Sequence, residues 1–292
     1  MSLTDFLQLN PGWFLTTVFI LGLLVGSFLN VVISRLPLML QREWHAQCQE
    51  ILELEDSSEK PERLDLSRPR SHCPLCGHMI TALENIPVIS YLFLRGRCSG
   101  CRKPISIRYP IIELLTATLM LMVAWHYGYS YQTALALVLT CYLIALTFID
   151  ADHQLLPDVM VLPLLWLGIL ANLNDLYTNL ESSIIGAVAG YLVLWILFQI
   201  HHRLTGKIGM GYGDFKLLAV IGAWGGWQIL PVTLILSSLV GAAVGISLII
   251  FRSRDRDTRI PFGPYLAAAG WISLLWGDDL TRLYLNWSGL NP

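Results

Sequence analysis

Residues 14–33 read FLTTVFILGLLVGSFLNVVI and contain no charged side chain. This largely apolar run of twenty residues is long enough for a helix to cross about 30 Å of hydrocarbon. A cleaved signal peptide is not indicated, because residues 1–13 contain no Lys or Arg and residues 34–37 (SRLP) do not form a small-residue cleavage site. The sequence therefore predicts a first membrane span that the protein retains.

The composition extends this prediction to the rest of the chain. Of the 292 residues, 54% are hydrophobic and 14% are charged, whereas soluble domains carry about 25% charged residues. A chain of this length cannot enclose so much apolar surface, so we expect much of it to face lipid. Seven further apolar segments lie at 109–126, 132–149, 155–172, 183–201, 215–230, 232–251 and 262–276. The sequence predicts an all-α polytopic membrane protein with about eight transmembrane helices.

The positive charges indicate how the spans are oriented. Alternating spans would place four loops on one side of the membrane: 35–108, 150–154, 202–214 and 252–261. These loops, together with Lys216 just inside the sixth span, contain every Lys and Arg except Arg282, while the opposite loops, including 172–182, contain none. Because basic loops remain in the cytoplasm, we expect this side to be cytoplasmic and both ends of the chain to lie outside.

The loop at 35–108 is a hydrophilic module, with eleven of the nineteen Lys and Arg residues and five of the six Cys residues. It contains two CxxC pairs, CPLCG starting at Cys73 and CSGC starting at Cys98. Paired thiolates on tight turns can bind one tetrahedral Zn²⁺, and Gly77 and Gly100 suit such turns. Four thiolates leave no open position for water, so the metal would be structural. The predicted zinc ligands are Cys73, Cys76, Cys98 and Cys101.

Other features of the module receive simpler interpretations. Disulfides are disfavoured because the predicted compartment is reducing. His72 and His78 flank the first CxxC pair, but with four sulfurs available we expect them to be exposed loop residues. The acidic run from Glu53 to Glu62 is expected to be solvated surface rather than a binding element.

Acidic residues at two span ends suggest chemistry. The third segment ends FIDADH, which contains Asp150, and the sixth begins GMGYGDFK, which contains Asp214. The third span runs inward and the sixth outward, so both carboxylates are expected at the same cytoplasmic depth, where acidic groups are costly and often functional. Two neighbouring carboxylates share one proton. The ionised one can activate water against a peptide carbonyl, and the protonated one can donate to the carbonyl oxygen.

Residues around Asp214 would support such a site. Gly211 and Gly213 allow backbone to approach closely, so an extended substrate could lie beside the carboxylate. Asp214 opens a helix close to Lys216, and both the helix dipole and the lysine favour its ionised form. Asp150 closes a helix, where the dipole disfavours negative charge. We therefore expect Asp214 to be the base in the resting protein.

Structural roles compete with this interpretation. Boundary carboxylates often cap helices, and Asp214 after Gly213 fits an N-cap position. Asp152 and Asp158 compete with Asp150 for the catalytic role. Asp158 is also well placed to cap the fourth span or to support the site.

At these residues the sequence resembles the type 4 prepilin peptidases, the GxGD aspartic proteases that remove leaders in type IV pilus assembly and type II secretion. The matching stretches are 26–32, both CxxC pairs, 149–158, 209–216 and 260–265. The resemblance implies that Asp150 and Asp214 are the catalytic pair. It implies substrates that are type IV prepilins and pseudopilins, whose short basic leaders are cut off after a glycine. It also implies N-methylation of the new N-terminal residue with S-adenosylmethionine.

The resemblance further implies a multi-pass enzyme of the bacterial inner membrane with its active site facing the cytoplasm. We expect a periplasmic N-terminus and first helix at 1–34, a zinc-binding cytoplasmic module at 35–108, and a peptidase domain with seven further helices at 109–292. No Gly-rich loop occurs in a βαβ context, so the residues that bind the methyl donor are not indicated. We expect them between the module and the first span. The expected partners are the substrates and the lipid bilayer, and no nucleic acid.

Two other functions remain open from the residues. A proton-coupled transporter could use Asp150 and Asp214 as a relay, but transporters usually place such groups near the midplane and often contain inverted repeats. A zinc-organised assembly factor without catalytic activity would retain its function when both aspartates are replaced by Asn.

Overall fold

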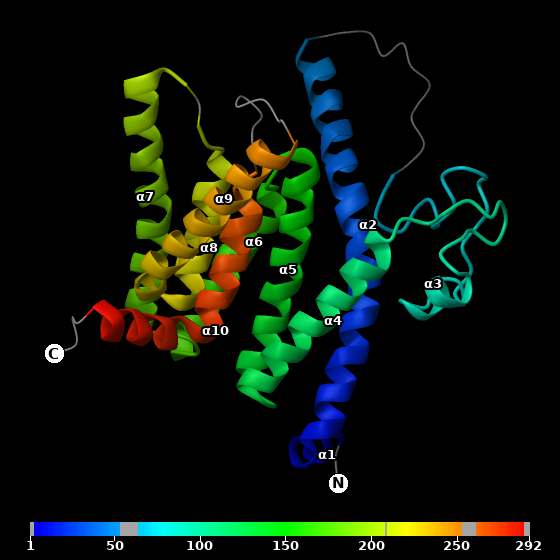
Figure 1. The fold of residues 1–292 in the computed structure, drawn as a ribbon, viewed down its shortest axis with the longest axis horizontal. Coiled ribbons are helices and arrows are strands. Elements are labelled where there is room, and N and C mark those ends of the chain that lie inside the picture. The colour runs from blue at the N-terminus through cyan, green and yellow to red at the C-terminus, as the bar shows by residue number, and fades with distance from the viewer. Residues whose placement is uncertain (1–2, 53–63, 208, 253–260, 289–292) are drawn as a thin grey trace. The chain divides into compact units, whose positions relative to one another are not determined.

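The computed structural model describes residues 3–52, 64–207, 209–252 and 261–288. Within these ranges the secondary structure is helical, apart from two isolated extended bridges. The all-α prediction is confirmed. The helices are α1 (Leu3–Leu9), α2 (Pro11–Ile51), α3 (Ile89–Phe93), α4 (Arg108–Tyr127), α5 (Tyr131–His153), α6 (Asp158–Ala171), α7 (Leu180–Thr205), α8 (Tyr212–Gly225), α9 (Leu230–Arg252) and α10 (Gly263–Ser288), with 3₁₀ turns at Asn172–Asn174 and Trp227–Ile229 (Figure 1).

Several of these helices can cross a membrane. Among the described residues, five helical segments are long and apolar enough: Pro11–Ile51, Arg108–Tyr127, Tyr131–His153, Leu180–Thr205 and Trp227–Ser247. Helices α6 and α8 have 14 residues each, or about 21 Å at 1.5 Å per residue, which is less than the hydrocarbon thickness. The chain is therefore a multi-pass membrane protein. The number of eight spans stays a prediction.

Two helices differ in extent from the apolar segments that predicted them. Helix α2 has 41 residues and continues to Ile51, well past residue 33, so the first part of the hydrophilic loop is helical. Helix α10 continues past residue 276 to Ser288, and Trp276 at this point has non-helical backbone angles (φ −131°, ψ 17°). In both helices, polar turns extend an element whose apolar part alone was visible in the sequence.

The chain divides into two compact units, Met1–Thr133 and Ala134–Pro292. In the first unit, α2 packs along α4. The side-chain amide of buried Asn30 in α2 donates 3.2 Å hydrogen bonds to the carbonyl oxygens of Gly26 and Tyr109. This bond to Tyr109 joins α2 to the first turn of α4.

In the second unit, α8 is surrounded by other helices, because α6, α7 and α10 all pack against it. Ten of its residues are buried, from Asp214 to Trp224. The buried Asn172 amide donates to the carbonyl oxygens of Ala223 (2.9 Å) and Trp224 (3.0 Å). The Trp224 indole donates to the carbonyl oxygen of Leu164 at 2.9 Å. These bonds fix the C-terminal end of α8 against α6.

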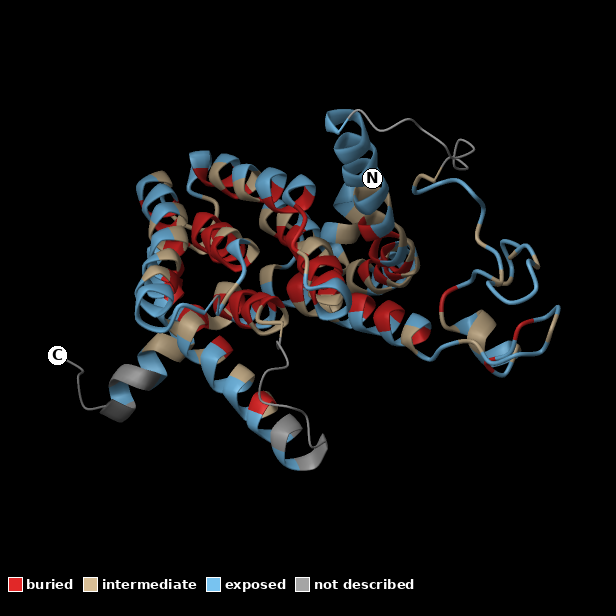
Figure 2. Ribbon diagram, turned by 90° about the horizontal axis from the view of Figure 1, so that it is seen from above, coloured by how far each residue is buried: buried red, intermediate tan, exposed pale blue. Residues whose placement is uncertain are grey.

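The outer side of this unit is apolar as well. Figure 2 shows buried residues where the helices face one another and exposed residues on their outer sides. Large apolar side chains exposed on α7 include Ile184, Ile185, Val188, Leu192, Ile196 and Leu197. An apolar face of this size is not stable in water, and lipid is the medium that covers it.

Candidate functional site

A cavity of about 490 Å³ lies in the second unit, where the C-terminal end of α5 meets the N-terminal ends of α6 and α8 and the segment before α10. All six residues that the sequence predicted as catalytic or supporting in this region line it: Asp150, Asp158, Gly211, Gly213, Asp214 and Lys216. Segments far apart in the chain thus bring the predicted set to one place.

Asp150 and Asp214 are both buried in this cavity. Asp150 lies in the last turn of α5 and is 6% exposed, while Asp214 lies in the first turn of α8 and is 7% exposed. The two carboxylates line this cavity from different helices. Oδ2 of Asp150 has no hydrogen-bond partner among the described residues. Buried polar atoms are nearly always paired, so this unpaired oxygen marks Asp150 as a candidate functional group.

The first turn of α8 corrects the N-cap interpretation of Asp214. The N-cap residue is Gly211, and Asp214 occupies the third position of the helix. Its Oδ2 accepts a hydrogen bond from the Gly211 amide at 3.3 Å. Carboxylates at this position satisfy an otherwise unpaired amide and interact favourably with the helix dipole. The same interaction holds the Asp214 carboxylate in place beside the cavity.

The neighbouring aspartates take different positions. Asp158 pairs with Lys216, whose Nζ lies 2.7 and 2.8 Å from the two carboxylate oxygens. This ion pair joins α6 to α8 at the cavity, with both side chains partly exposed. Asp152 is exposed and does not line the cavity. Asp150 is thus the buried member among the three aspartates of this segment.

Two glycines explain how closely the site is packed. A methyl group added at Gly213 would lie 2.8 Å from Cβ of Leu156, so only glycine allows α8 this close to the α5–α6 connection. A methyl group at Gly263 would lie 2.5 Å from Oδ2 of Asp150. Sequence reasoning missed Gly263 and the cavity residues Pro261 and Phe262. The available signal was the stretch IPFGPY, which matched the resembled family but received no role.

The four cysteines of the two CxxC pairs lie together in the first unit. Their sulfur atoms are within 4.8 Å of one another, with Cys73 to Cys101 at 3.9 Å and Cys76 to Cys98 at 4.0 Å. These distances exclude disulfides, whose S–S length is about 2.05 Å. A tetrahedral zinc ion with Zn–S bonds of about 2.3 Å places its sulfurs about 3.8 Å apart. The donor set and its spacing therefore fit a four-coordinate metal site.

The two cysteine turns have the same backbone hydrogen bonds. In the first, the Cys73 amide donates to the carbonyl of His78 at 2.9 Å, and in the second the Cys98 amide donates to the carbonyl of Lys103 at 2.9 Å. Each turn also contains one residue with positive φ: Gly77 (70°) in the first and Arg102 (57°) in the second. The prediction for Gly77 fits this conformation, but Arg102 rather than Gly100 is its counterpart.

The closeness of the two turns gives Gly100 a different role. A methyl group there would lie 3.1 Å from Cβ of His78, so Gly100 allows the second turn to approach the first.

The pKa of the Cys73 thiol is lowered to about 7, first because the Leu75 amide bonds to it. Although the His78 amide bonds to the Cys76 thiol, burial and the neighbouring sulfurs raise the pKa of this thiol to about 11, so without a metal the four thiols do not favour the thiolate alike.

Glu84 is a further residue that sequence reasoning missed. Its carboxylate accepts hydrogen bonds from the Ser99 hydroxyl, from the Thr81 amide (2.8 Å) and from the Thr81 hydroxyl (2.9 Å), and it lies 3.3 Å from Nε2 of His78. Because Ser99 and then Thr81 bond to it, the pKa of Glu84 is lowered to about 2. His78 is thus engaged in linking the two cysteine turns rather than being a free loop residue.

Two buried carboxylates in one cavity are the arrangement of aspartic peptidases, and here they occur in a multi-pass membrane protein. Comparison with known proteins agrees with this class. Residues 20–127 match the family described as bacterial peptidase A24 N-terminal domain, and residues 137–246 match the type IV leader peptidase family.

Curated relatives match over nearly the whole chain. A protein of Pseudomonas aeruginosa is 55% identical over 289 residues, covering 99% of each chain, and one of Aeromonas hydrophila is 57% identical over 275 residues, covering 94% of this chain and 95% of the relative. One of Legionella pneumophila is 45% identical over 282 residues, covering 96% and 98%. All three are named prepilin leader peptidase/N-methyltransferase. The chain belongs to the type IV leader peptidase family. No solved structure matches it.

Proposed function

We propose that this protein is a membrane aspartic endopeptidase that removes the leader of type IV prepilins and pseudopilins after a glycine, and that it N-methylates the new N-terminal residue. One observation carries the peptidase activity: Asp150 and Asp214, from two separate helices, are both buried and line the same cavity. The names of the curated relatives support the same activity. They favour an enzyme over the transporter and the assembly factor.

Catalysis follows from the position of the two carboxylates. Two carboxylates that share a buried cavity are not both easily ionised, so the pair holds one proton between them. The ionised carboxylate takes a proton from water as the water oxygen attacks the scissile carbonyl carbon. The protonated carboxylate donates its proton to the carbonyl oxygen, which gives a neutral tetrahedral intermediate. In the second step the C–N bond breaks as the carboxyl group that took the proton from water gives it to the leaving amine. The carboxylate that donated its proton in the first step takes one from a hydroxyl of the intermediate, so the pair again holds one proton.

The surroundings of the pair favour Asp214 as the base. Asp214 accepts the Gly211 amide and lies at a helix N-terminus, and both features stabilise negative charge. Oδ2 of Asp150 has no hydrogen-bond partner among the described residues, so a proton on this carboxyl group can be donated to a substrate oxygen. Infrared titration of the unchanged protein tests the assignment, with the two Asp→Asn variants used to assign the bands, and a shared proton found on Asp214 would reverse it.

The supporting residues shape the cavity. Gly211 has no side chain beside Asp214, so an extended peptide can pass close to the carboxylate. Gly213 lets α8 pack closely on Leu156. The Asp158–Lys216 ion pair joins α6 to α8 at the cavity. In this proposal the pair is a positioning element and takes no part in proton transfer.

The cysteine site and the methyl donor complete the proposal. Cys73, Cys76, Cys98 and Cys101 hold a structural zinc ion, because all four positions are filled by protein ligands and none remains for water. S-adenosylmethionine supplies the methyl group that is transferred to the new N-terminal amine.

The proposed topology places the chemistry at the inner face of the bacterial inner membrane. Eight alternating spans put the module, the α5–α6 connection and the α7–α8 connection on the side that carries nearly all of the Lys and Arg residues. Asp150 and Asp214 adjoin these connections. The site therefore faces the cytoplasm, where a basic leader would remain.

The peptidase proposal is tested by incubating purified protein in detergent with a prepilin and following the substrate by mass spectrometry. We expect Asp150→Asn and Asp214→Asn each to abolish leader removal. Asp152→Asn is the matched control, since this aspartate lies on the same helix turn but outside the cavity, and it should cleave normally. Cleavage that survives in both cavity variants refutes the mechanism.

The second activity and the metal have separate readouts. Adding S-adenosylmethionine should raise the product mass by one methyl group, and cleavage without this increase would refute the methyltransferase proposal alone. Purified protein should contain one zinc ion per chain, and Cys73→Ser with Cys98→Ser should lose it. Zinc retained by this double variant would refute the four-cysteine site.

A further inference from the structure

The segment between Glu84 and Glu113 is strongly basic. It contains five Lys and Arg residues and no Asp or Glu. Four of the cations are exposed, namely Arg95, Arg97, Arg102 and Lys103. The fifth, Arg108, is the first residue of α4, which is long and apolar enough to cross a membrane. The basic segment is therefore attached directly to a membrane helix.

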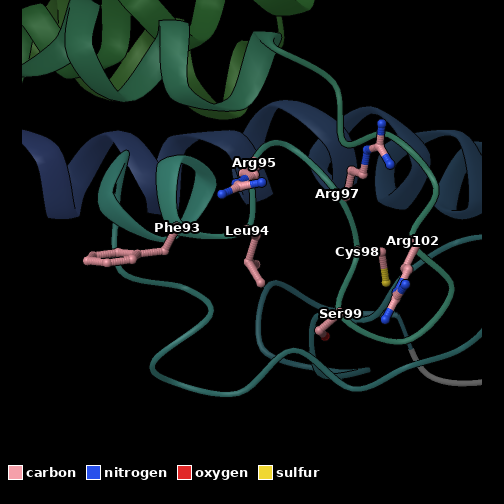
Figure 3. Close-up of a pocket in the computed structure, with 7 residues that line it drawn as sticks. All are labelled: Phe93, Leu94, Arg95, Arg97, Cys98, Ser99 and Arg102. Atoms are coloured by element: carbon pink, nitrogen blue, oxygen red, sulfur yellow. The ribbon is translucent and has the colours of Figure 1, made fainter.

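Three of these arginines line a cavity of about 540 Å³ beside the cysteine site. Figure 3 shows Phe93 at one end of this cavity and Arg102 next to Cys98 at the other. No carboxylate lines the cavity. Within the described ranges, the guanidinium groups of Arg95, Arg97 and Arg102 have no recorded hydrogen bond or ion pair. The cavity thus offers positive charge without an internal counter-charge from the described part of the chain.

A hydrogen bond sets the level of α3 relative to the membrane helix. The Val88 amide, just before α3, donates to Oε2 of Glu113 at 2.8 Å. Glu113 is five residues after Arg108, which corresponds to about 7.5 Å along the axis of α4. The start of α3 is therefore held beside a part of α4 that lies deeper than its basic end.

The side chains of α3 suit this position. Ile89 is 49% exposed, Leu92 68% and Phe93 84%. These apolar residues are followed directly by the basic residues Arg95 and Arg97. Apolar side chains next to Lys and Arg are typical of segments that lie at the membrane interface.

We propose that this basic face, formed by Arg95, Arg97, Arg102 and Lys103, docks onto anionic lipid headgroups, with the apolar side chains of α3 entering the headgroup boundary. Clusters of at least four Lys and Arg residues next to a membrane helix bind acidic lipids, and guanidinium groups bind phosphate with paired hydrogen bonds. The basic leader of the proposed substrate is excluded as the occupant because the arginines would repel it. The inference depends on the module lying next to the membrane, and not on the peptidase mechanism.

The strength of docking can be expressed per arginine. A Lys or Arg near an anionic membrane surface strengthens binding about fivefold. Loss of Arg95 and Arg97 together is then expected to lower the docking equilibrium constant about thirty-fold. The protection that docking gives to backbone amides should fall by about the same factor.

The experiment uses full-length protein in nanodiscs of phosphatidylcholine, with or without phosphatidylglycerol, and hydrogen–deuterium exchange measured by mass spectrometry. We expect amides in residues 89–103 to exchange more slowly with phosphatidylglycerol present, and added salt to reverse the effect. Arg95→Gln with Arg97→Gln should remove the protection. Arg68→Gln with Arg70→Gln, which removes the same charge from exposed positions of the module, should keep it.

Several results would overturn the proposal. These are equal exchange in both lipid mixtures, or protection that persists in the Arg95→Gln/Arg97→Gln variant or in high salt. Equal protection by inorganic phosphate with phosphatidylcholine alone would also overturn it, because the site would then be an anion pocket rather than a membrane-docking face. Zinc content reports whether the variants are folded, and the salt titration needs no variant. Leader removal in the same samples tests the peptidase proposal separately.

Discussion

The substitution Gly263→Ala tests the proposed site without replacing either catalytic aspartate. Gly263 is the first residue of α10, and a methyl group there would lie 2.5 Å from Oδ2 of Asp150. Ordinary contact begins at 3.4 Å, so the carboxylate or the end of α10 has to move by about 0.9 Å. A displacement of about 1 Å in a reacting group costs about 100-fold in rate. We therefore expect leader removal to slow about 100-fold, or about 2.7 kcal/mol in activation free energy.

The fold should tolerate the same substitution. The atom that the methyl group meets is the far end of a side chain that can turn, and φ at Gly263 is not in the left-handed region. We expect the free energy of unfolding to change by no more than about 1 kcal/mol. Gly241→Ala in α9 is the control, because its methyl group would lie 3.4 Å from the nearest atom, in Tyr265. This variant should match the unchanged protein in both measurements.

The assay is single-turnover cleavage of a prepilin with enzyme in excess, so that product release does not limit the rate. Thermal unfolding in the same detergent is measured in parallel. Reasoning from the position of Gly263 fails if Gly263→Ala cleaves within about twofold of the unchanged protein. It also fails if the loss of rate is matched by unfolding at the assay temperature.

Further predictions concern stability and protonation. Asn172→Ala should lower the free energy of unfolding by about 3 kcal/mol, because it leaves buried backbone groups unpaired. The control Asn174→Ala, at an exposed position, should change it by less than about 0.5 kcal/mol. Chemical denaturation in detergent measures both variants, and equal effects would contradict the reasoning. The pKa of Glu84 is lowered from its ordinary value of 4.5 to about 2. The ionised Glu84 carboxylate therefore stabilises the fold above pH 4.5, and this contribution is lost as the pH falls through about 2. The ¹³C signal of the Glu84 carboxyl group should stay constant from pH 8 to about pH 4, and a titration midpoint near 4.5 would refute this. Lys216→Met should lower the free energy of unfolding by less than about 1 kcal/mol, because the ion pair between Lys216 and Asp158 is partly exposed. A decrease of more than about 2 kcal/mol in chemical denaturation would show that the ion pair stabilises the fold more than a surface pair does.

Much of the fold could be read from the sequence, because lipid-facing helices need long uncharged runs. The runs at 109–126 and 132–149 correspond closely to α4 and α5. The continuation of α2 to Ile51 could not be read in this way, because a helix that leaves the membrane no longer needs an apolar sequence. For the same reason the polar turns after Trp276 in α10 were not predicted.

The candidate site was predictable in depth but not in lateral position. Alternating spans place Asp150 and Asp214 at one level, and only the packing of the helices in the second unit brings them into one cavity. Gly263 could not be assigned because its role depends on where the start of α10 meets Asp150. Arg102 was missed as the counterpart of Gly77, because a non-glycine residue with positive φ leaves no compositional signal.

The shortness of α6 and α8 has a consequence for the environment of the proposed reaction. If both helices cross the membrane as the sequence predicts, their length of about 21 Å does not match a hydrocarbon layer of about 30 Å. We then expect the bilayer to become thinner around them or water to enter above their ends. The proposed site lies at one of these ends. A hydrolase acting next to lipid is thereby supplied with water, and its rate should depend on the acyl-chain length of the surrounding phospholipids.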